Sequence, residues 1–103
     1  MTDEPTTVPL DASTGLLVLD ERDDVAIATR DLAAGERFSY GGREIEMGEP
    51  VSFGHKVALG PIARGSIVRK YGEVIGTATA AIAAGGHVHV HNLTSARLPG
   101  SGR

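Results

Sequence analysis

The four histidines are the residues of this sequence with the most chemistry to offer. All of them lie in two short segments, residues 54–59 and residues 86–92. Imidazole binds divalent metals and transfers protons near neutral pH, so histidines that meet in a fold can form a metal or acid/base site. Glycines and short apolar stretches adjoin both segments. We therefore expect any chemistry of this protein where the two segments meet.

In the second segment three histidines alternate with two valines over residues 87–91. Successive side chains of a β-strand point to opposite faces, so a strand here places the imidazoles on one face and the valines in the core. Successive Cβ atoms on one face are about 7 Å apart, which makes a row rather than a cluster. A metal site is built more easily from two neighbouring strands, with water or a carboxylate completing it.

His55 is the candidate ligand from the first segment. His89 and His91 are the candidates from the second, because they and Asn92 lie toward the end of the predicted strand, where a loop can open to a substrate. His87 stands next to a Gly corner and is expected to be structural. The alternative is a solvated polar face that happens to contain histidine and performs no chemistry.

Lys56 follows His55 directly after a glycine. In a functional interpretation Lys56 supplies a fixed positive charge for a substrate carboxylate, and His55 acts as a metal ligand or an acid/base group. The alternative is an exposed turn. Tyr71 and Glu73 flank Gly72 in a second tight turn, and their residue types alone favour packing and solvation over chemistry.

Composition limits the class of protein. The chain has 103 residues, enough for one domain, and its lack of cysteine excludes disulfides, thiolate metal sites and cysteine nucleophiles. A net charge of −3 argues against nucleic acid or anionic lipid as a partner. No signal peptide is recognisable, and no apolar run approaches the roughly 20 residues of a membrane span. We expect a soluble, cytoplasmic protein.

Fourteen glycines and five prolines favour short strands and turns over long helices. Three similar phrases, each with an apolar residue, two small or polar residues and a glycine before a new strand, predict a recurring corner at residues 31–38, 61–68 and 81–88. Hairpins are predicted between residues 16–19 and 25–28 and, through a Gly-Gly turn, between residues 37–40 and 43–47. The fold is predicted to be mainly β, with at most single helical turns. The domain is expected at residues 14–97, between a flexible lead-in at 1–13 and a flexible tail at 98–103.

Much of the sequence resembles the SAF domain of the altronate dehydratase family. The specific features are a Gly-His-Lys turn and a Tyr-Gly-x-x-Ile-Gly turn at this spacing, within residues 50–59, 62–65, 68–76, 82–85 and 87–93. In that family the domain is either the N-terminal part of altronate and galactarate dehydratases or a separate small subunit. The separate form occurs in altronate dehydratase and in sulfolactate sulfo-lyase.

The resemblance implies a β-clip, a short, folded-over and mainly antiparallel sheet. It also implies metal-assisted β-elimination on a hydroxy acid, with Fe²⁺ or else Mn²⁺ as the divalent cofactor, shared with a large catalytic subunit. A metal that binds the carboxylate and a hydroxyl makes the α proton more acidic and assists the leaving group. The family's large catalytic domain is not found in this sequence, so we expect the chain to need that large subunit as a partner.

Matching positions carry the family's motifs into this sequence. His55 and Lys56 occupy the Gly-His-Lys turn, with expected catalytic roles, and Lys56 is also expected to bind substrate. Tyr71 and Gly72 occupy the Tyr-Gly turn and, with Asn92, are expected to contact the substrate. The metal ligands expected at the shared interface are His55, His89 and His91.

The sequence therefore predicts a small SAF-domain subunit of a metal-dependent lyase that removes water from a sugar acid of the altronate type. Three alternatives stay open. The chain can be the small subunit of a sulfolactate sulfo-lyase, with sulfite as the leaving group. It can be a non-catalytic module that binds a sugar acid or a metal for another protein, or a purely structural assembly domain.

Overall fold

The computed structural model describes residues 6–95, which form ten short strands and contain no helix. A central antiparallel sheet has the order β2 (Leu16–Leu17), β3 (Val25–Ala28), β6 (Lys56–Ala58) and β9 (His87–Val88). One flanking sheet has the order β1 (Thr7–Pro9), β4 (Arg37–Tyr40) and β5 (Arg43–Glu46). The other has the order β10 (Leu93–Ser95), β8 (Glu73–Ala78) and β7 (Ile67–Lys70). The mainly β fold class is confirmed.

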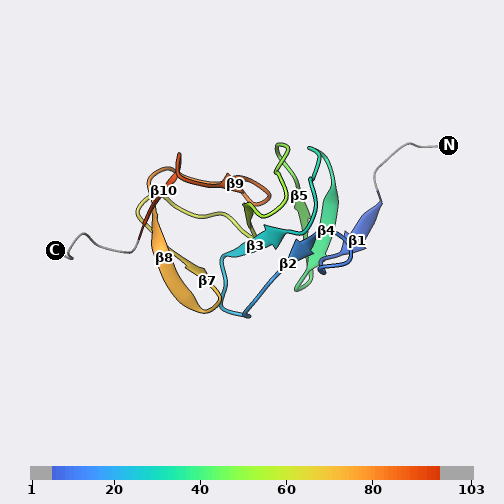
Figure 1. Cartoon of the computed structure of the whole chain (residues 1–103), viewed down its shortest axis with the longest axis horizontal. Coiled ribbons are helices and arrows are strands. Elements are labelled where there is room, and N and C mark those ends of the chain that lie inside the picture. The colour runs from blue at the N-terminus through green and yellow to red at the C-terminus, as the bar shows by residue number, and fades with distance from the viewer. Residues whose placement is uncertain (1–5, 96–103) are drawn as a thin grey trace.

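The central sheet lies between the two smaller sheets (Figure 1). Its two middle strands, β3 and β6, are largely buried. Alternate residues of a strand face opposite sides of the sheet, so each strand contributes to two core clusters. Ala26 and Val57 pack into one core cluster with Phe38, whereas Val25 and Ala58 pack into a second. The second cluster is completed by residues from β7, β8, β9 and two corners, namely Val68, Ala78, Val88, Ile62 and Ile82.

The three predicted corners are present and share one geometry. Their glycines, Gly35, Gly65 and Gly85, have φ angles of +92°, +88° and +83°. In each corner the glycine N–H donates to a backbone carbonyl at 2.8 Å, on Met47, Ala78 and Ala58 respectively. The residue after each glycine donates to the carbonyl three positions earlier, which closes the turn. The repeated apolar-x-x-Gly phrase therefore encodes a repeated backbone turn.

A fourth corner, at residues 51–56, carries the same phrase and was missed as a repeat in the sequence. Gly54 has a φ of +86°, and its N–H donates to the carbonyl of Ala28 at 2.8 Å. His55 N–H then donates to the Ser52 carbonyl at 3.0 Å. Val51 bridges to Leu32 of the first corner, as the two later corners bridge each other through their isoleucines. This fourth corner delivers His55 to the start of β6.

Both predicted hairpins form, between β2 and β3 and between β4 and β5. Three features differ from the sequence expectations. Residues 7–9, placed in the flexible lead-in, form β1 and pair in parallel with β4. The predicted strand at 87–91 ends at Val88. The expected tail at 98–103 and the domain end at 97 lie outside the described residues.

Asp23 stabilises the turn between β7 and β8. Its buried carboxylate accepts the N–H of Gly72 at 2.8 Å and the N–H of Asp20 at 3.1 Å. We expect Asp23→Ala to lower the free energy of unfolding by about 1–3 kcal/mol, because a half-buried N–H loses its acceptor. Urea denaturation measures this, with the exposed Glu21→Ala as the control, for which a change within about 0.5 kcal/mol is expected. Equal losses in both variants would contradict this role of Asp23.

Candidate functional site

Strand pairing brings the two histidine segments together. β6 pairs with β9 in antiparallel register, with Lys56 opposite Val88 and Val57 opposite His87. His55 immediately precedes β6 and His89 immediately follows β9, so both lie at the same end of this strand pair. The meeting of the two segments, which was inferred from residue type alone, is therefore built into the central sheet.

Three imidazoles converge there. His55 Nδ1 and His87 Nε2 are 2.9 Å apart and form a hydrogen bond, in which the tautomer decides which nitrogen donates. The ring of His55 stacks on that of His89 with centroids 4.6 Å apart, and the rings of His87 and His89 are 5.3 Å apart. One nitrogen from each of the three lies within 4.8 Å of the others. We call His55, His87 and His89 the histidine cluster.

The cluster differs from the straight row expected from the sequence. The chain leaves the strand after Val88 and turns over residues 89–92, so Val90 is 82% exposed rather than in the core. Asn92 closes this turn: its side-chain oxygen accepts the N–H of His89 at 2.9 Å, and its amide donates to the carbonyl of His87 at 2.8 Å. The side chain of Asn92, expected to contact substrate, is thus engaged with the backbone.

The positions of His91 and His87 relative to the cluster are the reverse of those expected from the sequence. The His91 ring lies 5.3 Å from that of His87, but His91 is not among the three residues whose nitrogens converge. His87, expected to be structural, occupies the cluster instead. Glu49 also reaches this point, because its carboxylate accepts the backbone N–H of His87 at 3.2 Å. Sequence reasoning missed Glu49, and its position just before the fourth corner was the available signal.

Desolvation and neighbouring positive charges favour the neutral form of two cluster imidazoles, those of His87 and His89. Desolvation, followed by the charges of the neighbouring histidines, lowers the pKa of His87 from its ordinary value of 6.5. Desolvation, followed by the charges of His55 and Lys56, lowers the pKa of His89. Metals bind imidazole in its neutral form, so the lowered pKa values of His87 and His89 favour the form that a metal ion needs.

This electrostatic setting predicts a pH dependence of stability. A histidine whose pKa is lower in the folded chain binds protons more readily when unfolded, so the free energy of unfolding decreases as pH falls from above about 6.5 to the folded-state pKa. In metal-free protein, His87→Gln should make this decrease smaller. Urea denaturation at about pH 7.5 and about pH 5.5 measures it, and an unchanged difference between the two pH values in the variant would refute the assignment.

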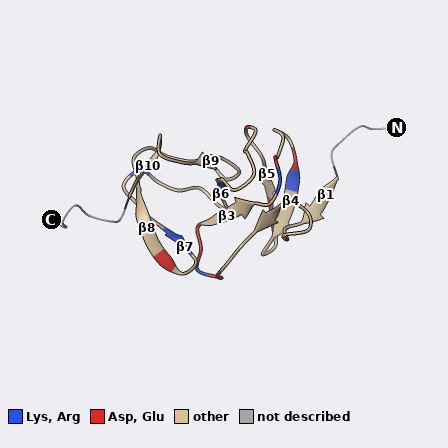
Figure 2. Ribbon diagram, viewed as in Figure 1, with Lys and Arg blue, Asp and Glu red and all other residues tan. Residues whose placement is uncertain are grey.

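A pocket of ≈ 270 Å³ adjoins the cluster and shares His89 with it. Lys56 from β6 and Lys70 from β7 line it, and Figure 2 shows positive charge on both strands. Desolvation, followed by the charge of Lys70, lowers the pKa of Lys56. The expected position of Lys56 beside a histidine site is thus realised, with a second lysine that the sequence interpretation did not single out.

Tyr71 and Gly72 lie apart from the histidine cluster. Their turn joins β7 to β8 at the bottom of Figure 1, whereas β9 lies at the top. Gly72 contacts Arg22 and Asp23 on the β2–β3 connection, and neither turn residue lines the lysine pocket. Tyr71 has a φ of +58°, which is unusual for a bulky residue, and it is 70% exposed. The structure therefore does not bring these two positions to the cluster.

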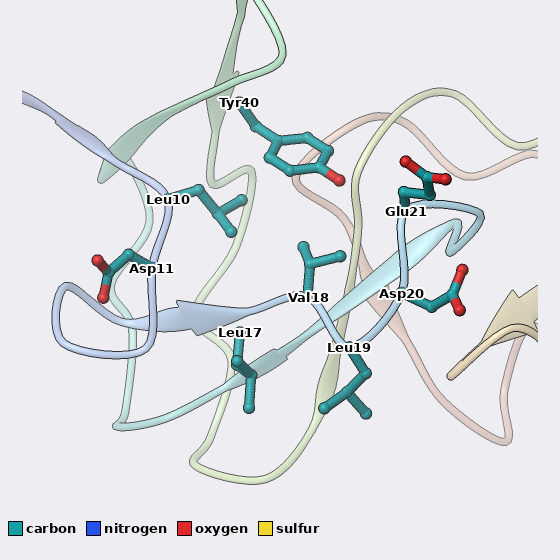
Figure 3. Close-up of a pocket in the computed structure, with 8 residues that line it drawn as sticks. All are labelled: Leu10, Asp11, Leu17, Val18, Leu19, Asp20, Glu21 and Tyr40. Atoms are coloured by element: carbon teal, nitrogen blue, oxygen red, sulfur yellow. The ribbon is translucent and has the colours of Figure 1, made fainter.

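A second hollow, of ≈ 380 Å³, lies beside β2, the edge strand of the central sheet. In Figure 3 the side chains of Leu10, Val18 and Tyr40 point toward one another, and Asp20 and Glu21 stand at the rim. Asp20 is already paired with Arg22 at 3.0 Å. The described residues that line the hollow include no lysine, arginine or histidine, so it does not suit an anionic substrate.

These observations define a small all-β domain with Gly corners that presents a histidine cluster beside a lysine pocket. The chain belongs to the altronate/galactarate dehydratase SAF domain family, whose sequence profile matches residues 14–96. It is 50% identical over 70 residues to altronate dehydratase of Escherichia coli, which covers 68% of this chain and 14% of that protein. It is also 45% identical over 47 residues to the (2R)-sulfolactate sulfo-lyase subunit alpha of Paracoccus pantotrophus, covering 46% of this chain and 70% of that subunit.

The fraction of each relative's length that this chain covers differs greatly. The chain spans about one seventh of the altronate dehydratase length, and 12% of the galactarate dehydratase (L-threo-forming) of Escherichia coli, to which it is 50% identical over 68 residues. Among residues 6–95 no helix is long and apolar enough to cross a membrane.

Proposed function

We propose that this chain is a small SAF-domain subunit of a metal-dependent lyase, which eliminates water from a sugar acid of the altronate type together with a separate large catalytic subunit. The observation that carries the proposal is the convergence of His55, His87 and His89 next to a pocket that contains Lys56. Membership of the altronate/galactarate dehydratase SAF domain family supports the reaction class. The absence of cysteine suits the reducing cytoplasm, where we place the protein.

The cluster fits a divalent metal. Imidazole nitrogens are suitable ligands for Fe²⁺ and other first-row ions, and the three nitrogens already lie within 4.8 Å of one another. His55, His87 and His89 would hold the ion, with Fe²⁺ or Mn²⁺ as the candidates. Bound there, the ion would supply a Lewis acid that increases the acidity of the substrate's α proton and assists departure of its hydroxyl group.

The chain's own residues would bind and orient the substrate. Lys56 presents an ammonium group to the pocket that borders His89, so it can hold a carboxylate while the rest of the acid faces the cluster. The hydrogen bonds of Asn92 fix the turn that carries His89, which keeps this imidazole in place before substrate arrives.

Openness of the site supports a shared active site. The cluster side chains are only half-buried. Phe53, two residues before His55, is 68% exposed, and Val90, directly after His89, is 82% exposed. Elimination needs a general base, and exclusion of bulk water favours it; an enclosed pocket excludes water better than an open surface does. A large catalytic subunit covering this face would provide them.

Sulfolactate sulfo-lyase is the second candidate, because this chain matches 70% of a subunit alpha of that enzyme. The two lyases share the carboxylate and the α proton of the substrate and differ in the leaving group, water or sulfite. The histidine cluster and the lysine pocket serve either reaction. An assay with both substrates therefore decides between the two reactions.

The direct test is an assay of the tagged chain recovered from its own cells with the proteins bound to it. We expect formation of a 2-oxo acid from altronate, and sulfite release from sulfolactate if the second candidate is correct. His55→Ala should then lower kcat. A variant that only raises KM, with kcat unchanged, would favour the non-catalytic binding module over the lyase subunit.

A further inference from the structure

The lysine pocket has an unusual distribution of charge for an acidic protein. Among residues 6–95 its lining contains Lys56, Lys70 and His89, with Ile75, Val90, Leu93 and Ser95 as the other walls, and no aspartate or glutamate. The whole chain carries 13 acidic and 10 basic residues, so a pocket with two ammonium groups and no carboxylate departs from its average composition. Two cations in one pocket repel each other, and a bound anion relieves that repulsion.

Neither lysine has a counter-ion among residues 6–95. The ion pairs found there are Arg22 with Asp20, Arg30 with Glu36 and Arg37 with Glu46. Glu73 lies opposite Lys70 in the β7–β8 register, yet the two form no ion pair. Within the described part of the chain, both ammonium groups are therefore available to a ligand from solution.

We propose that Lys70 acts with Lys56 as a two-lysine anion site that holds the carboxylate of the substrate beside the histidine cluster. The proposal deepens the proposed function and rests on it for the identity of the ligand, a hydroxy acid. Lys70 is thereby a substrate-binding residue on β7, contributed by a different sheet from that of Lys56.

The geometry explains why two strands are needed. Lys56 lies on the central sheet and Lys70 at the end of β7 in a flanking sheet, so the pocket forms only where these sheets meet. His89 belongs to both the pocket and the cluster, so a carboxylate bound by the lysines would place its adjacent hydroxyl-bearing carbon near the imidazoles. The site thus orients a hydroxy acid as well as binding its charge.

The test uses the full chain, free of metal, and D-altronate as the probe. Backbone NMR shifts of residues lining the pocket should follow a single binding curve with D-altronate and should not respond to D-altritol, which has the same carbon chain without the carboxylate. Lys70→Met should weaken binding by about 10-fold or more, as expected for a hydrogen bond to a charged group. Lys70→Arg, which retains the charge, should recover most of the affinity.

Arg64→Met is the matched control. Arg64 is exposed on the second corner and does not line the pocket, and its loss changes the net charge by the same amount as Lys70→Met. Its affinity for D-altronate should stay within about twofold of the wild type, because a distant exposed charge is screened. Equal weakening in both variants, unchanged affinity in Lys70→Met, or no binding by the wild-type chain would each overturn the proposal.

The two hypotheses can fail separately. If the metal-free chain binds D-altronate through Lys70 while the complex eliminates nothing, the lyase proposal fails and the anion site stands. If the complex is an active lyase and Lys70→Met leaves KM unchanged, the anion site fails and the lyase proposal stands.

Discussion

Replacement of His55 by alanine is expected to lower the affinity of the chain for a divalent metal by at least about 100-fold, since loss of a group that only orients a ligand already costs about 10–100-fold. His55 contacts both other members of the cluster: its Nδ1 lies 2.9 Å from His87 Nε2, and its ring stacks on that of His89. Removing it leaves two imidazoles from one segment. Titration of the isolated chain with Mn²⁺ or, anaerobically, with Fe²⁺ measures the affinity.

The other histidines give this experiment its controls. His87→Ala should weaken metal binding as severely as His55→Ala, because its nitrogen converges with those of His55 and His89. His91→Ala should bind metal within a few-fold of the wild type. The reverse order, with His91 essential and His87 dispensable, would contradict the cluster and restore the ligand set expected from the sequence.

Gly85→Ala should abolish stable folding or lower the free energy of unfolding by about 4 kcal/mol or more, in the range reserved for exceptional substitutions. Gly85 has a φ of +83°, and a Cβ atom there would stand 1.9 Å from the carbonyl oxygen of Glu46. Since that neighbour is backbone, no side-chain rotation relieves the overlap. The third corner would have to move, together with the start of β9 that it positions.

Gly35→Ala is the matched control, because Gly35 occupies the equivalent place in the first corner with a φ of +92° and nothing within 4 Å of its added Cβ. It should cost only the backbone strain, about 1–2 kcal/mol. Thermal and urea denaturation of both variants measure the difference. Similar losses would show that the close approach at Glu46 does not distinguish the two corners.

The fold was accessible from the sequence because its signals are local. Each corner needs a glycine at positive φ, and the apolar-x-x-Gly phrase predicts where that glycine lies. The hairpin turn at Gly41 and Gly42 is encoded in the same way, with φ angles of +59° and +81°. The fourth corner at residues 51–56 has the same apolar-x-x-Gly phrase, but its second intervening residue is the bulky Phe53, whereas the other three corners have small or polar residues there.

The site was less accessible because it depends on contacts between distant segments. A period-two pattern at residues 87–91 predicts a strand, and it does not predict that the side-chain amide of Asn92 donates a hydrogen bond to the carbonyl of His87. That turn moves Val90 into solvent and decides which histidines converge. Lys70 could not be found either, since only the folded chain places it in one pocket with Lys56.

Affinity purification of the tagged chain from its native cells, with mass spectrometry of the bound proteins, tests the central claim most directly. A lyase subunit whose histidine cluster lies half-buried at the surface should return with one stoichiometric partner, related to the part of altronate dehydratase that this chain does not cover. Recovery of the chain alone and monomeric would contradict the two-subunit enzyme, and the histidine cluster would then have to serve a free-standing binding domain.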